Sequence, residues 1–521
     1  MKKFIRAITS GGALTFLAVI LELIISIALI FAFEQLLAVI PITIAGTNIS
    51  AIIIAVLKYI LAFILIVRLT VRDIAPDTKL PWITILVFAP FAGILLYLLF
   101  SRYVPTKKRR RLAEEISKHS MNYSISGDDC ADKLDYFYGD SRYLYNYSNA
   151  VPHRNCKTTF FSSGETFVSD YLNELKGAKK YILLEYFIIE RGEFFDSILE
   201  ILKQKVAEGV KIKMMYDDIG CISHIERGFC KQMNDLGIEC KIFSKFTPII
   251  SAVHNNRDHR KMTIIDGRVC YTGGLNLADE YVNYTSPLGR WKDSVLKIEG
   301  SAVRNMIVLF LDLFQEQTPN YIEDYSEYFP SYYEKFENDS VVQPFGHGPR
   351  PKYKNIIGED TILNMIEKAS NYMYISTPYL IIDYNLTNSL CRAAKRGVDV
   401  RIITPHIYDK KIVSWITKRS YKKLINEGVK IYEYLPGFIH AKNYLCDGKT
   451  GMVATINMDY RSLIHHYECG VWMHNAECLK DIKKDFDITF GECQRMTKET
   501  AKMSLPKRFI SAIGSIFSPL L

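Results

Sequence analysis

One short pattern occurs twice in this chain with the same internal spacing. In each copy a histidine, a lysine two positions later and an aspartate five positions after that are followed, ten positions further on, by an asparagine. The two sets are His259, Lys261, Asp266 and Asn276, and His440, Lys442, Asp447 and Asn457. A single His-x-Lys is ordinary on an exposed strand, but a matched pair in one register indicates a duplicated domain with one motif in each half.

The hydrophobic pattern repeats around the two copies as well. In the first half a buried strand is expected at 180–189, an amphipathic helix at 194–208 and a further strand at 210–216. The second half has the same order of strand, helix and strand over 371–404, and in both halves a glycine directly follows the helix. The chain is therefore expected to contain a tandem duplication of an α/β unit.

The first hundred residues are strongly apolar, unlike the mixed-charge sequence that follows. Three runs, at 13–40, 51–67 and 81–100, come close to the length that crosses a bilayer. The first is longer than a signal-peptide core and has no small-residue cleavage site, so we expect it to be retained. All three polar flanks are basic, and three full crossings cannot place them all on one side. The third run, interrupted by Pro90 and Gly93, is expected to form either a re-entrant helix pair or a kinked span.

Charged residues in and after the apolar runs also indicate how this region would interact with a membrane. Glu22 and Lys58 lie inside apolar runs, where an isolated charge is costly, and we hypothesise that they pair across a hairpin of the first two runs. The basic run 107–111 follows the third apolar run and contributes to the net charge of +9. Such a cluster faces the cytoplasm and attracts anionic lipid, so nucleic acid is the poorer interpretation.

These features divide the 521 residues into six segments. The expected fold has N-terminal transmembrane helices followed by a duplicated α/β fold of two α/β/α sandwich halves. The segments are a membrane anchor of two or three hydrophobic helices at 1–101, a basic juxtamembrane linker at 102–157, the first half at 158–317, a connecting segment at 318–354, the second half at 355–500 and an amphipathic C-terminal tail at 501–521. The tail is expected either to contact the membrane or to dock on the domain.

The side chains of the motif suit phosphoryl chemistry. An imidazole can attack phosphorus or donate a proton near neutral pH. Lysine and asparagine donate hydrogen bonds to the non-bridging phosphate oxygens, which become more negative in the transition state. Two copies brought face to face would supply one histidine as nucleophile and the other as general acid. We expect no metal and no cofactor.

Other candidate residues receive a structural interpretation. Asp217 and Asp218 follow a strand and form either an acid pair for a metal or a strand-end brace, and the brace is favoured because no glycine-rich phosphate loop lies nearby. Eleven cysteines without a C-x-x-C pair indicate reduced thiols rather than a disulfide framework or a zinc site. The histidines that lack the lysine spacing and are expected to be structural include His254, His347, His465 and His466.

At these motifs the chain resembles the phospholipase D superfamily, which carries two His-x-Lys-x4-Asp motifs, and within it the bacterial cardiolipin synthases. The resemblance covers nearly the whole chain. It rests on the basic run after an apolar region, residues 256–266, Gly273-Gly274-Leu275-Asn276, Trp291-Lys292-Asp293, Thr377-Pro378-Tyr379, His440-Ala441-Lys442, residues 457–462 and the ending Ser518-Pro519-Leu520-Leu521. The chain departs from the family in having Ala454-Thr455-Ile456-Asn457 where Gly-Ser-x-Asn is usual, and a third apolar run where two are typical.

The resemblance implies a phosphatidyl transfer. One phosphatidylglycerol loses glycerol and passes its phosphatidyl group, through a phosphohistidine, to a second phosphatidylglycerol, which gives cardiolipin. By analogy His259 is the nucleophile, and His440 is the acid and then the base. The alternative is a membrane-bound phospholipase D hydrolase or a transphosphatidylase that uses another alcohol.

The resemblance also implies roles for the remaining motif residues. Asp293 and Glu468 are the candidates for orienting the histidines, and Asp266 and Asp447, although part of the catalytic motif, are expected to brace the fold. The residues expected to hold phosphate are Lys261, Lys442, Asn276, Asn457 and Thr455, the last of which keeps a hydroxyl donor. The implied location is a bacterial cell membrane, with several crossings and a cytoplasmic catalytic region. The expected partners are phosphatidylglycerol, cardiolipin and the lipid bilayer, without nucleic acid.

Overall fold

The computed structural model describes the ranges 43–44, 47–48, 50–72, 74, 76–100, 107–123, 130–245, 255–318, 323–350 and 352–520. The chain divides into two compact units, one formed by 1–104, 246–255 and 513–521 and the other by 105–245 and 256–512. The apolar run 13–40, Glu22 with its hypothetical ion pair, and His254 lie outside the described residues.

The first unit contains a short hairpin and three packed helices. The hairpin pairs β1 (Thr43–Ile44) with β2 (Thr47–Asn48), and the helices are α3 (Ser50–Val71), α4 (Pro76–Phe88) and α5 (Pro90–Phe100). The helices share a small core that includes Leu69, Trp82 and Tyr97. Gly93 lets α5 approach α4 closely, because a Cβ there would lie 2.9 Å from the carbonyl oxygen of Ile85.

The prediction of N-terminal transmembrane helices is wrong for the part of the chain that the structure describes. No helix there is both long and apolar enough to cross a membrane. In the third apolar run the helix stops before Pro90, which has no N–H to continue the hydrogen-bond pattern, and helices of 13 and 11 residues result. Both are shorter than the ~20 residues that a crossing requires. The interruption expected at Pro90 is therefore confirmed. The kinked span, a single helix that crosses the membrane through Pro90, is not observed.

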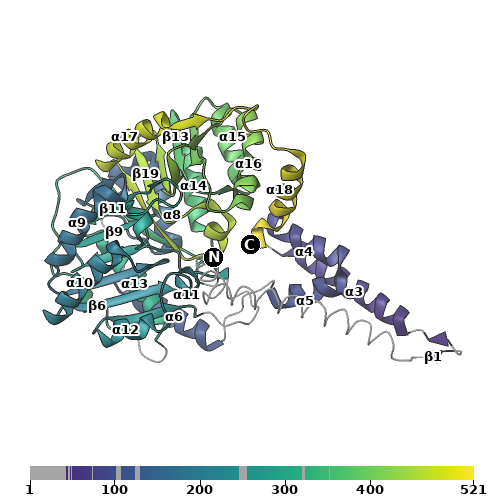
Figure 1. Ribbon diagram of the computed structural model, residues 1–521, viewed down its shortest axis with the longest axis horizontal. Coiled ribbons are helices and arrows are strands. Elements are labelled where there is room, and N and C mark those ends of the chain that lie inside the picture. The colour runs from purple at the N-terminus through teal and green to yellow at the C-terminus, as the bar shows by residue number, and fades with distance from the viewer. Residues whose placement is uncertain are drawn as a thin grey trace, which may run out of the picture. The chain divides into compact units, whose positions relative to one another are not determined.

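The second unit contains two sheets with matching strand order. The first runs β4-β11-β9-β8-β5-β6-β7, and the second runs β22-β16-β15-β13-β18-β19-β21-β12-β3. Seven strands of each correspond when the second sheet is followed from its other end. The parallel pairs β5–β6 and β6–β7 match β13–β15 and β15–β16, and the other pairs among these strands are antiparallel in both sheets. This topology supports the predicted duplication of an α/β unit (Figure 1).

The bounds of the strands follow the predicted order. The first sheet contains β4 (Lys157–Phe161), β5 (Tyr181–Tyr186), β6 (Lys211–Asp217), β7 (Glu239–Phe243), β8 (Met262–Ile265), β9 (Val269–Gly273) and β11 (Val295–Glu299). The second contains β3 (His153–Arg154), β12 (Val341–His347), β13 (Tyr372–Ser376), β15 (Asp399–Pro405), β16 (Lys430–Tyr434), β18 (Asn443–Cys446), β19 (Thr450–Ala454), β21 (Glu468–His474) and β22 (Cys493–Arg495). Two short parallel pairs lie outside the sheets, β10 (Arg290–Lys292) with β17 (Gly437–Ile439) and β14 (Leu380–Ile381) with β20 (Met458–Asp459).

The helices flank these sheets. Those of the first half are α9 (Gly164–Gly177), α10 (Glu193–Ala207), α11 (Asp218–Cys221), α12 (Phe229–Asp235) and α13 (Val303–Glu316), and those of the second are α14 (Ile357–Lys368), α15 (Tyr384–Lys395), α16 (Lys411–Asn426) and α17 (Cys478–Gly491). Before and after them come α6 (Lys107–Met121), α7 (Ala131–Leu134), α8 (Tyr138–Ser148) and α18 (Leu505–Phe517). The helices predicted before Gly209 and Gly397 are confirmed as α10 and α15, and both glycines have a positive φ, +85° and +94°.

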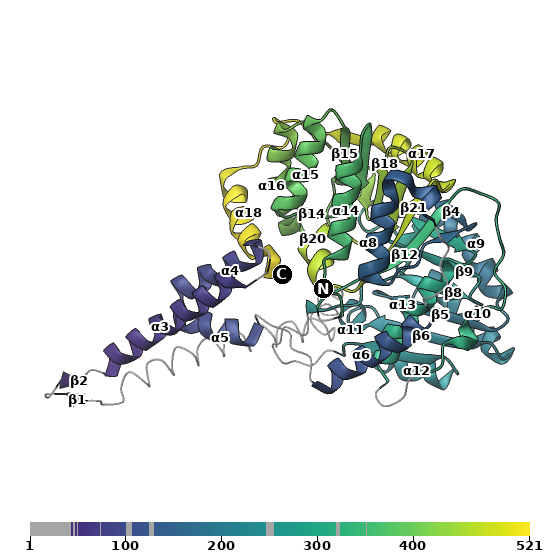
Figure 2. The same cartoon turned by 180° about the vertical axis from the view of Figure 1, so that it is seen from behind.

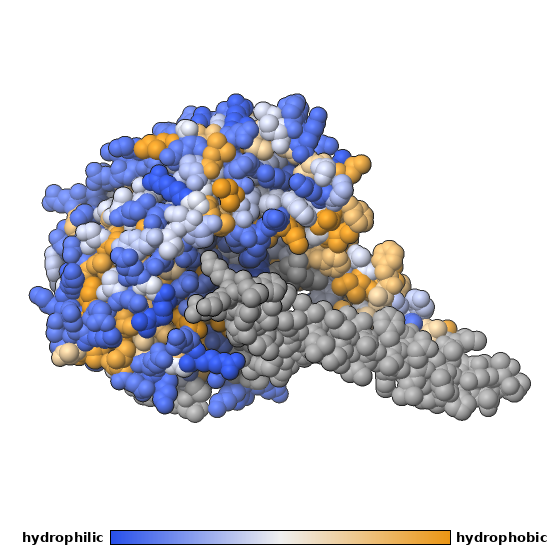
Figure 3. Space-filling view, in the orientation of Figure 1, coloured by the Kyte–Doolittle hydropathy of each residue, from blue (hydrophilic) through white to orange (hydrophobic). Residues whose placement is uncertain are grey.

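Helices α13 and α17 lie between the two sheets. Helix α13 contacts β8 and β9 of the first sheet and β12 of the second, and α17 contacts β4 and β18. Their apolar side chains form one core with the inner faces of both sheets, whereas α9, α10 and α12 cover the outer face of the first sheet and α14, α15 and α16 that of the second (Figure 2). Each half is thus an α/β/α sandwich. The exposed face of these layers is mainly hydrophilic (Figure 3).

Candidate active site

The two copies of the motif meet where the two halves are joined by backbone pairing. His259 lies just before β8 and His440 just before β18. The N–H of His259 donates to Tyr467 O at 2.9 Å, and the N–H of His440 donates to Lys292 O at 2.7 Å. Both contacts continue parallel pairings, between Asp258 and Tyr467 and between β17 and β10. Each motif histidine therefore donates its backbone N–H to a carbonyl oxygen of the opposite half.

Each histidine contacts a carboxylate from the opposite half. His259 Nδ1 lies 2.9 Å from Glu468 Oε1, and His440 Nδ1 lies 2.7 Å from Asp293 Oδ2. The histidines are each 7% exposed and both carboxylates are completely buried. A proton held at Nδ1 by such a carboxylate leaves Nε2 as the reactive nitrogen. The structure thus brings the two predicted orienting residues to the two motif histidines, crosswise.

Burial determines the charge of both histidines. It lowers the pKa of His440 to about 4, with a further contribution from Lys442. It also lowers the pKa of His259 well below the usual value, and the charges of Lys261, Lys442 and His440 act in the same direction. Both rings are therefore neutral near neutral pH in the unliganded protein. Since the second motif acts electrostatically on His259, the two motifs belong to one site.

The two lysines are buried beside the histidines. Lys261 Nζ donates to the carbonyl oxygen of His259 at 2.6 Å, and Lys442 Nζ contacts the carbonyl oxygen of His440 and lies 3.0 Å from its Nε2. Burial lowers the pKa of Lys261 to about 8 and that of Lys442 to about 7. Two ammonium groups in such an environment attract an anionic group strongly, because little water screens them.

The two asparagines of the motif differ in their hydrogen bonds. Asn276 Oδ1 accepts from the N–H of Ile188 at 3.0 Å, and its Nδ2 donates to the hydroxyl of Tyr281 at 2.8 Å. Asn457 Oδ1 is buried and, among the described residues, has no hydrogen-bond partner. The side-chain carbonyl oxygen of Asn457 is thus an unused acceptor, whereas both ends of the Asn276 amide are paired within the first half.

Two hydroxyl groups support Glu468. Thr455 Oγ1 donates to Glu468 Oε2 and Ser462 Oγ donates to Glu468 Oε1, each at 2.5 Å. The structure therefore places the Thr455 hydroxyl on the carboxylate that orients His259, whereas the sequence suggested a contact with phosphate. Ser462 was missed by sequence reasoning. Its signal is its position in the 457–462 segment that carries the family resemblance.

Asp266 and Asp447 occupy equivalent positions away from the histidines. Each carboxylate accepts three backbone N–H groups at the start of the strand that follows a helix, from Lys179, Lys180 and Tyr181 in the first half and from Ser370, Asn371 and Tyr372 in the second, at 2.7 to 3.0 Å. Both aspartates have a positive φ, +51° and +53°, in the turn of a hairpin. These contacts tie the motif hairpin to the neighbouring strand.

The Asp217 carboxylate is already paired. It accepts two hydrogen bonds from Arg257 Nε and one from Nη2, at 2.7 to 3.0 Å, and it also accepts the N–H groups of Gly220 and Asp258. Burial raises the pKa of Asp217 to about 6, against the lowering effect of Arg257. The structural role at the strand end is confirmed for Asp217. Because Asp217 also accepts the N–H of Asp258, it holds the backbone at the residue that precedes His259.

One group of three side chains has the composition of a metal site. Within the described residues, His259, His466 and Glu468 have possible ligand atoms within 4.8 Å of one another. The oxygens of Glu468, however, already receive Thr455, Ser462 and His259. The arrangement therefore fits an oriented histidine better than a metal centre.

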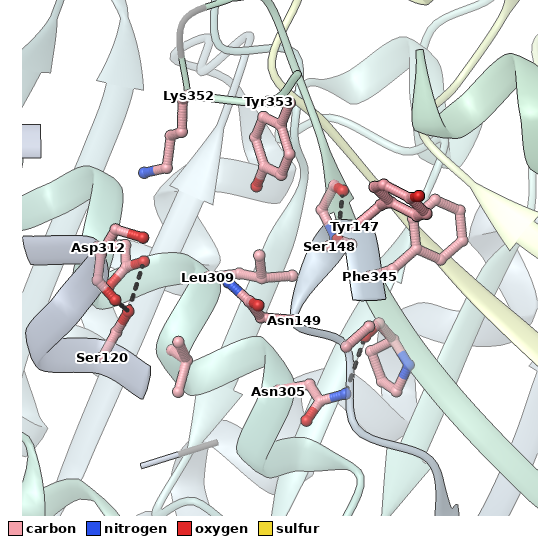
Figure 4. A pocket seen from close by; sticks show the side chains of 15 residues that line it. Ser120, Tyr147, Ser148, Asn149, Asn305, Leu309, Asp312, Phe345, Lys352 and Tyr353 are labelled. Atoms are coloured by element: carbon pink, nitrogen blue, oxygen red, sulfur yellow. Dashed lines mark hydrogen bonds between the residues drawn. The ribbon is translucent and has the colours of Figure 1, made fainter. Parts of the chain in front are cut away.

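A separate hollow of about 70 Å³ lies between α6, α8, α13 and β12 and is lined by none of the motif residues. Figure 4 shows Asp312 and Ser120 paired on one side of it and Lys352 beside Tyr353 on another. Lys352 Nζ donates to Glu316 at 2.7 Å, and Asn305 Nδ2 donates to Pro344 O at 2.9 Å. Because these polar groups satisfy one another, the hollow fits a structural gap rather than a second site.

Family comparisons match the regions that carry the motifs. A family model described as "Cardiolipin synthase, PLD-like domain" matches residues 171–289 and 362–489, and one described as "Phospholipase_D-nuclease N-terminal" matches 59–102. The chain is 38% identical over 385 residues to an uncharacterized protein of Streptococcus mutans, covering 74% of this chain and 83% of that one.

Two named relatives are similar over a longer stretch. Cardiolipin synthase 2 of Staphylococcus epidermidis is 30% identical over 457 residues, or 84% of this chain and 92% of the relative. A cardiolipin synthase of Staphylococcus aureus is 31% identical over 454 residues, or 84% and 90%. Among solved structures, the phosphatidylserine synthase of Haemophilus influenzae Rd KW20 matches with a TM-score of 0.55 at 14% identity, covering 74% of this chain and 99% of that one. The last likeness concerns the fold alone.

Proposed function

This chain belongs to the cardiolipin synthases of the phospholipase D superfamily, and we propose that it transfers a phosphatidyl group from one phosphatidylglycerol to another to give cardiolipin and glycerol. It is a phosphatidyltransferase. The observation that carries the proposed mechanism is the crossed pairing of His259 with Glu468 and of His440 with Asp293. Two oriented imidazoles, one from each half, with a buried lysine beside each, suit a two-step displacement at phosphorus.

In the first step His259 acts as the nucleophile. Its Nε2 attacks the phosphorus of a bound phosphatidylglycerol, while Glu468 stabilises the positive charge that the ring acquires. The bond between phosphorus and the headgroup oxygen breaks, and that oxygen takes a proton from His440. The negative phosphodiester raises the pKa of His440 on binding, so the ring carries this proton although burial keeps it neutral in the free enzyme.

In the second step His440 acts as the base. It removes the proton from a headgroup hydroxyl of a second phosphatidylglycerol, whose oxygen attacks phosphorus. The N–P bond to His259 breaks, and cardiolipin leaves. Lys261, Lys442 and Nδ2 of Asn457 donate hydrogen bonds to the non-bridging oxygens through both displacements. Asn276 contributes to the part of the site formed by the first half. Asp266 and Asp447 act only on the position of the motif hairpins.

We place this reaction at a bacterial membrane, because both substrates are bilayer lipids. Helix α6 begins with five consecutive basic residues, 107–111, in the second unit. Such a cluster is attracted to the anionic headgroups of phosphatidylglycerol. A cytoplasmic position of the catalytic unit agrees with eleven free cysteines, which need a reducing compartment.

The test is incubation of the full-length protein with vesicles of labelled phosphatidylglycerol, followed by separation of the lipids. Cardiolipin together with an equal amount of glycerol supports the proposal. Phosphatidic acid as the main product would show that water resolves the phosphohistidine and that the protein is a hydrolase. Lipid binding without turnover would reject both readings.

A further inference from the structure

A third histidine lies beside the nucleophile. His466 is 7% exposed, and its ring centroid is 5.4 Å from that of His259. Neither ring nitrogen has a hydrogen-bond partner among the described residues, and the nearest charged acceptor recorded for Nδ1, Glu468 Oε1, lies 3.7 Å away. Leaving such a group unpaired in a protein interior is costly, so a ligand that pairs with it is stabilised.

The other half has an equivalent side chain. Trp291 stands two residues before Asp293, as His466 stands two residues before Glu468. The Trp291 ring centroid is 5.7 Å from that of His440, and its Nε1 is also buried without a partner among the described residues. The duplication thus places beside each motif histidine a ring with unpaired nitrogen, Nε1 of Trp291 in one half and both ring nitrogens of His466 in the other.

The chemistry of the two rings identifies the ligand. An indole nitrogen only donates, so Trp291 requires an acceptor. Burial lowers the pKa of His466 to about 3, and its neutral ring carries one N–H. The ammonium groups of Lys261 and Lys442 lie beside the same two histidines and favour an anion. An anionic acceptor with several oxygens, such as a phosphodiester, satisfies both donors and both charges.

We propose that Trp291 and His466 are a second pair of phosphate-binding donors, related by the duplication, each giving its N–H to a non-bridging oxygen of the phosphoryl group. This proposal rests on the proposed function for the nature of the anion. The lysines supply charge from one pair of equivalent positions, and the two rings supply neutral N–H groups from another. A neutral donor holds the phosphoryl group without adding to the repulsion between the two ammonium groups.

The test uses inorganic vanadate, which takes up the five-coordinate geometry of phosphoryl transfer and needs no alcohol. Trp291→Phe keeps the ring and removes the N–H, and His466→Phe does the same in the second half. Each is expected to raise the inhibition constant for vanadate about tenfold or more, and the double variant is expected to show the product of the two effects. His466→Gln, which keeps an N–H donor, is expected to stay within about threefold of the unaltered protein.

Trp472→Phe is the matched control, because Trp472 Nε1 is also buried without a partner among the described residues but its ring stacks near His474. It is expected to leave the constant unchanged. The proposal is overturned if Trp291→Phe and His466→Phe behave like Trp472→Phe, or if His466→Gln loses as much as His466→Phe. Formation of phosphatidic acid instead of cardiolipin would reject the proposed function and leave this test intact. Failure of vanadate to inhibit the unaltered protein would reject the donor pair as well.

Discussion

The half-site of His259 and that of His440 share a backbone plan but differ in what holds the carboxylate. Glu468 receives two hydroxyl groups, from Thr455 and Ser462. Asp293 receives the backbone N–H of Ser294 at 2.8 Å and lies against Gly274, where a Cβ would be 2.0 Å from its Oδ1. The longer glutamate needs side-chain donors to fix it, whereas the shorter aspartate is fixed by the main chain. The two half-sites therefore share the crossed pairing of histidine and carboxylate but differ in the hydrogen-bond donors that hold each carboxylate.

The histidines themselves should give the largest effects, and their comparison separates the two roles. His259→Ala removes the nucleophile, so turnover should fall by about four orders of magnitude or more for any substrate. His440→Ala removes the acid, so it should recover activity on a phosphatidyl ester whose leaving group needs no proton, such as p-nitrophenol. Release of p-nitrophenol measures this. Recovery in His259→Ala instead of His440→Ala would reverse the assignment, and a rate within tenfold of the unaltered protein in His259→Ala would reject its role.

The carboxylates should come next. Glu468→Gln and Asp293→Asn keep size but remove the charge that orients each ring, and we expect kcat to fall about a hundredfold or more in both. Glu468 orients the nucleophile, so Glu468→Gln should slow formation of the phosphohistidine. Asp293 orients the acid and base, so Asp293→Asn should slow both formation of the phosphohistidine and its attack by the second alcohol. Rapid quench of the labelled phosphoenzyme separates these steps. Unchanged attack by the second alcohol in Asp293→Asn would show that Asp293 does not support the base.

This half-to-half comparison also shows how far the sequence leads. The motif spacing and the repeated hydrophobic pattern were sufficient for the α/β duplication, because the side-chain periodicity of strands and helices can be read from the sequence. The choice of Asp293 and Glu468 came from the resemblance to the phospholipase D superfamily. Thr455 was misplaced and Ser462 was missed. Their hydroxyl groups reach Glu468 through the fold of the second half, between β19 and β21, and no local sequence pattern specifies that contact.

The prediction of transmembrane helices failed for a different reason in the third apolar run, within the part of the chain that the structure describes. Hydropathy counts apolar residues in a window, but it does not register that Pro90 ends one helix and begins another. The same apolar side chains instead pack helix against helix, as Trp82 and Tyr97 do with ring centroids 5.5 Å apart. An apolar run is thus a weaker guide to a span than its length suggests when it contains a proline near the middle.

The two brace aspartates should affect stability rather than chemistry. Asp266→Asn and Asp447→Asn each replace a charged acceptor of three N–H groups by an amide, which costs about 2 to 3 kcal/mol of unfolding free energy where the site is buried. Asp266 is buried and Asp447 is only partly so, and the first variant should therefore be the less stable. Urea denaturation measures the difference. Equal losses would show that burial does not set the strength of the brace, and a large loss of kcat at full stability would assign the aspartates to the chemistry.

The hydroxyl supports of Glu468 provide a smaller and more specific test. Thr455→Val removes the Oγ1 hydrogen bond and keeps the shape, so kcat should fall about tenfold through a less firmly held Glu468. Thr455→Ser, which keeps the hydroxyl, is the matched control and should stay close to the unaltered protein. A direct phosphate contact predicts instead that Thr455→Val weakens vanadate binding by the same factor. Comparison of kcat with the vanadate inhibition constant decides between the two positions.

The lysines should give the smallest difference between the half-sites, visible only in the pH dependence. Burial lowers the pKa of Lys442 to about 7 and that of Lys261 to about 8. A lysine is charged below its pKa, so a rise in pH removes the ammonium of Lys442 first and that of Lys261 second. The decline of kcat/KM that His440 already imposes as the acid, with a free-enzyme pKa of about 4, should therefore become steeper above pH 7 as phosphate binding weakens. The bound phosphodiester raises both pKa values, so kcat should decline at a higher pH than kcat/KM. Lys442→Arg keeps a charge at every accessible pH and should move the onset in kcat/KM toward pH 8. A slope that does not change from pH 7 to 8, or an onset that Lys442→Arg leaves in place, would show that the second half does not lose its charge first.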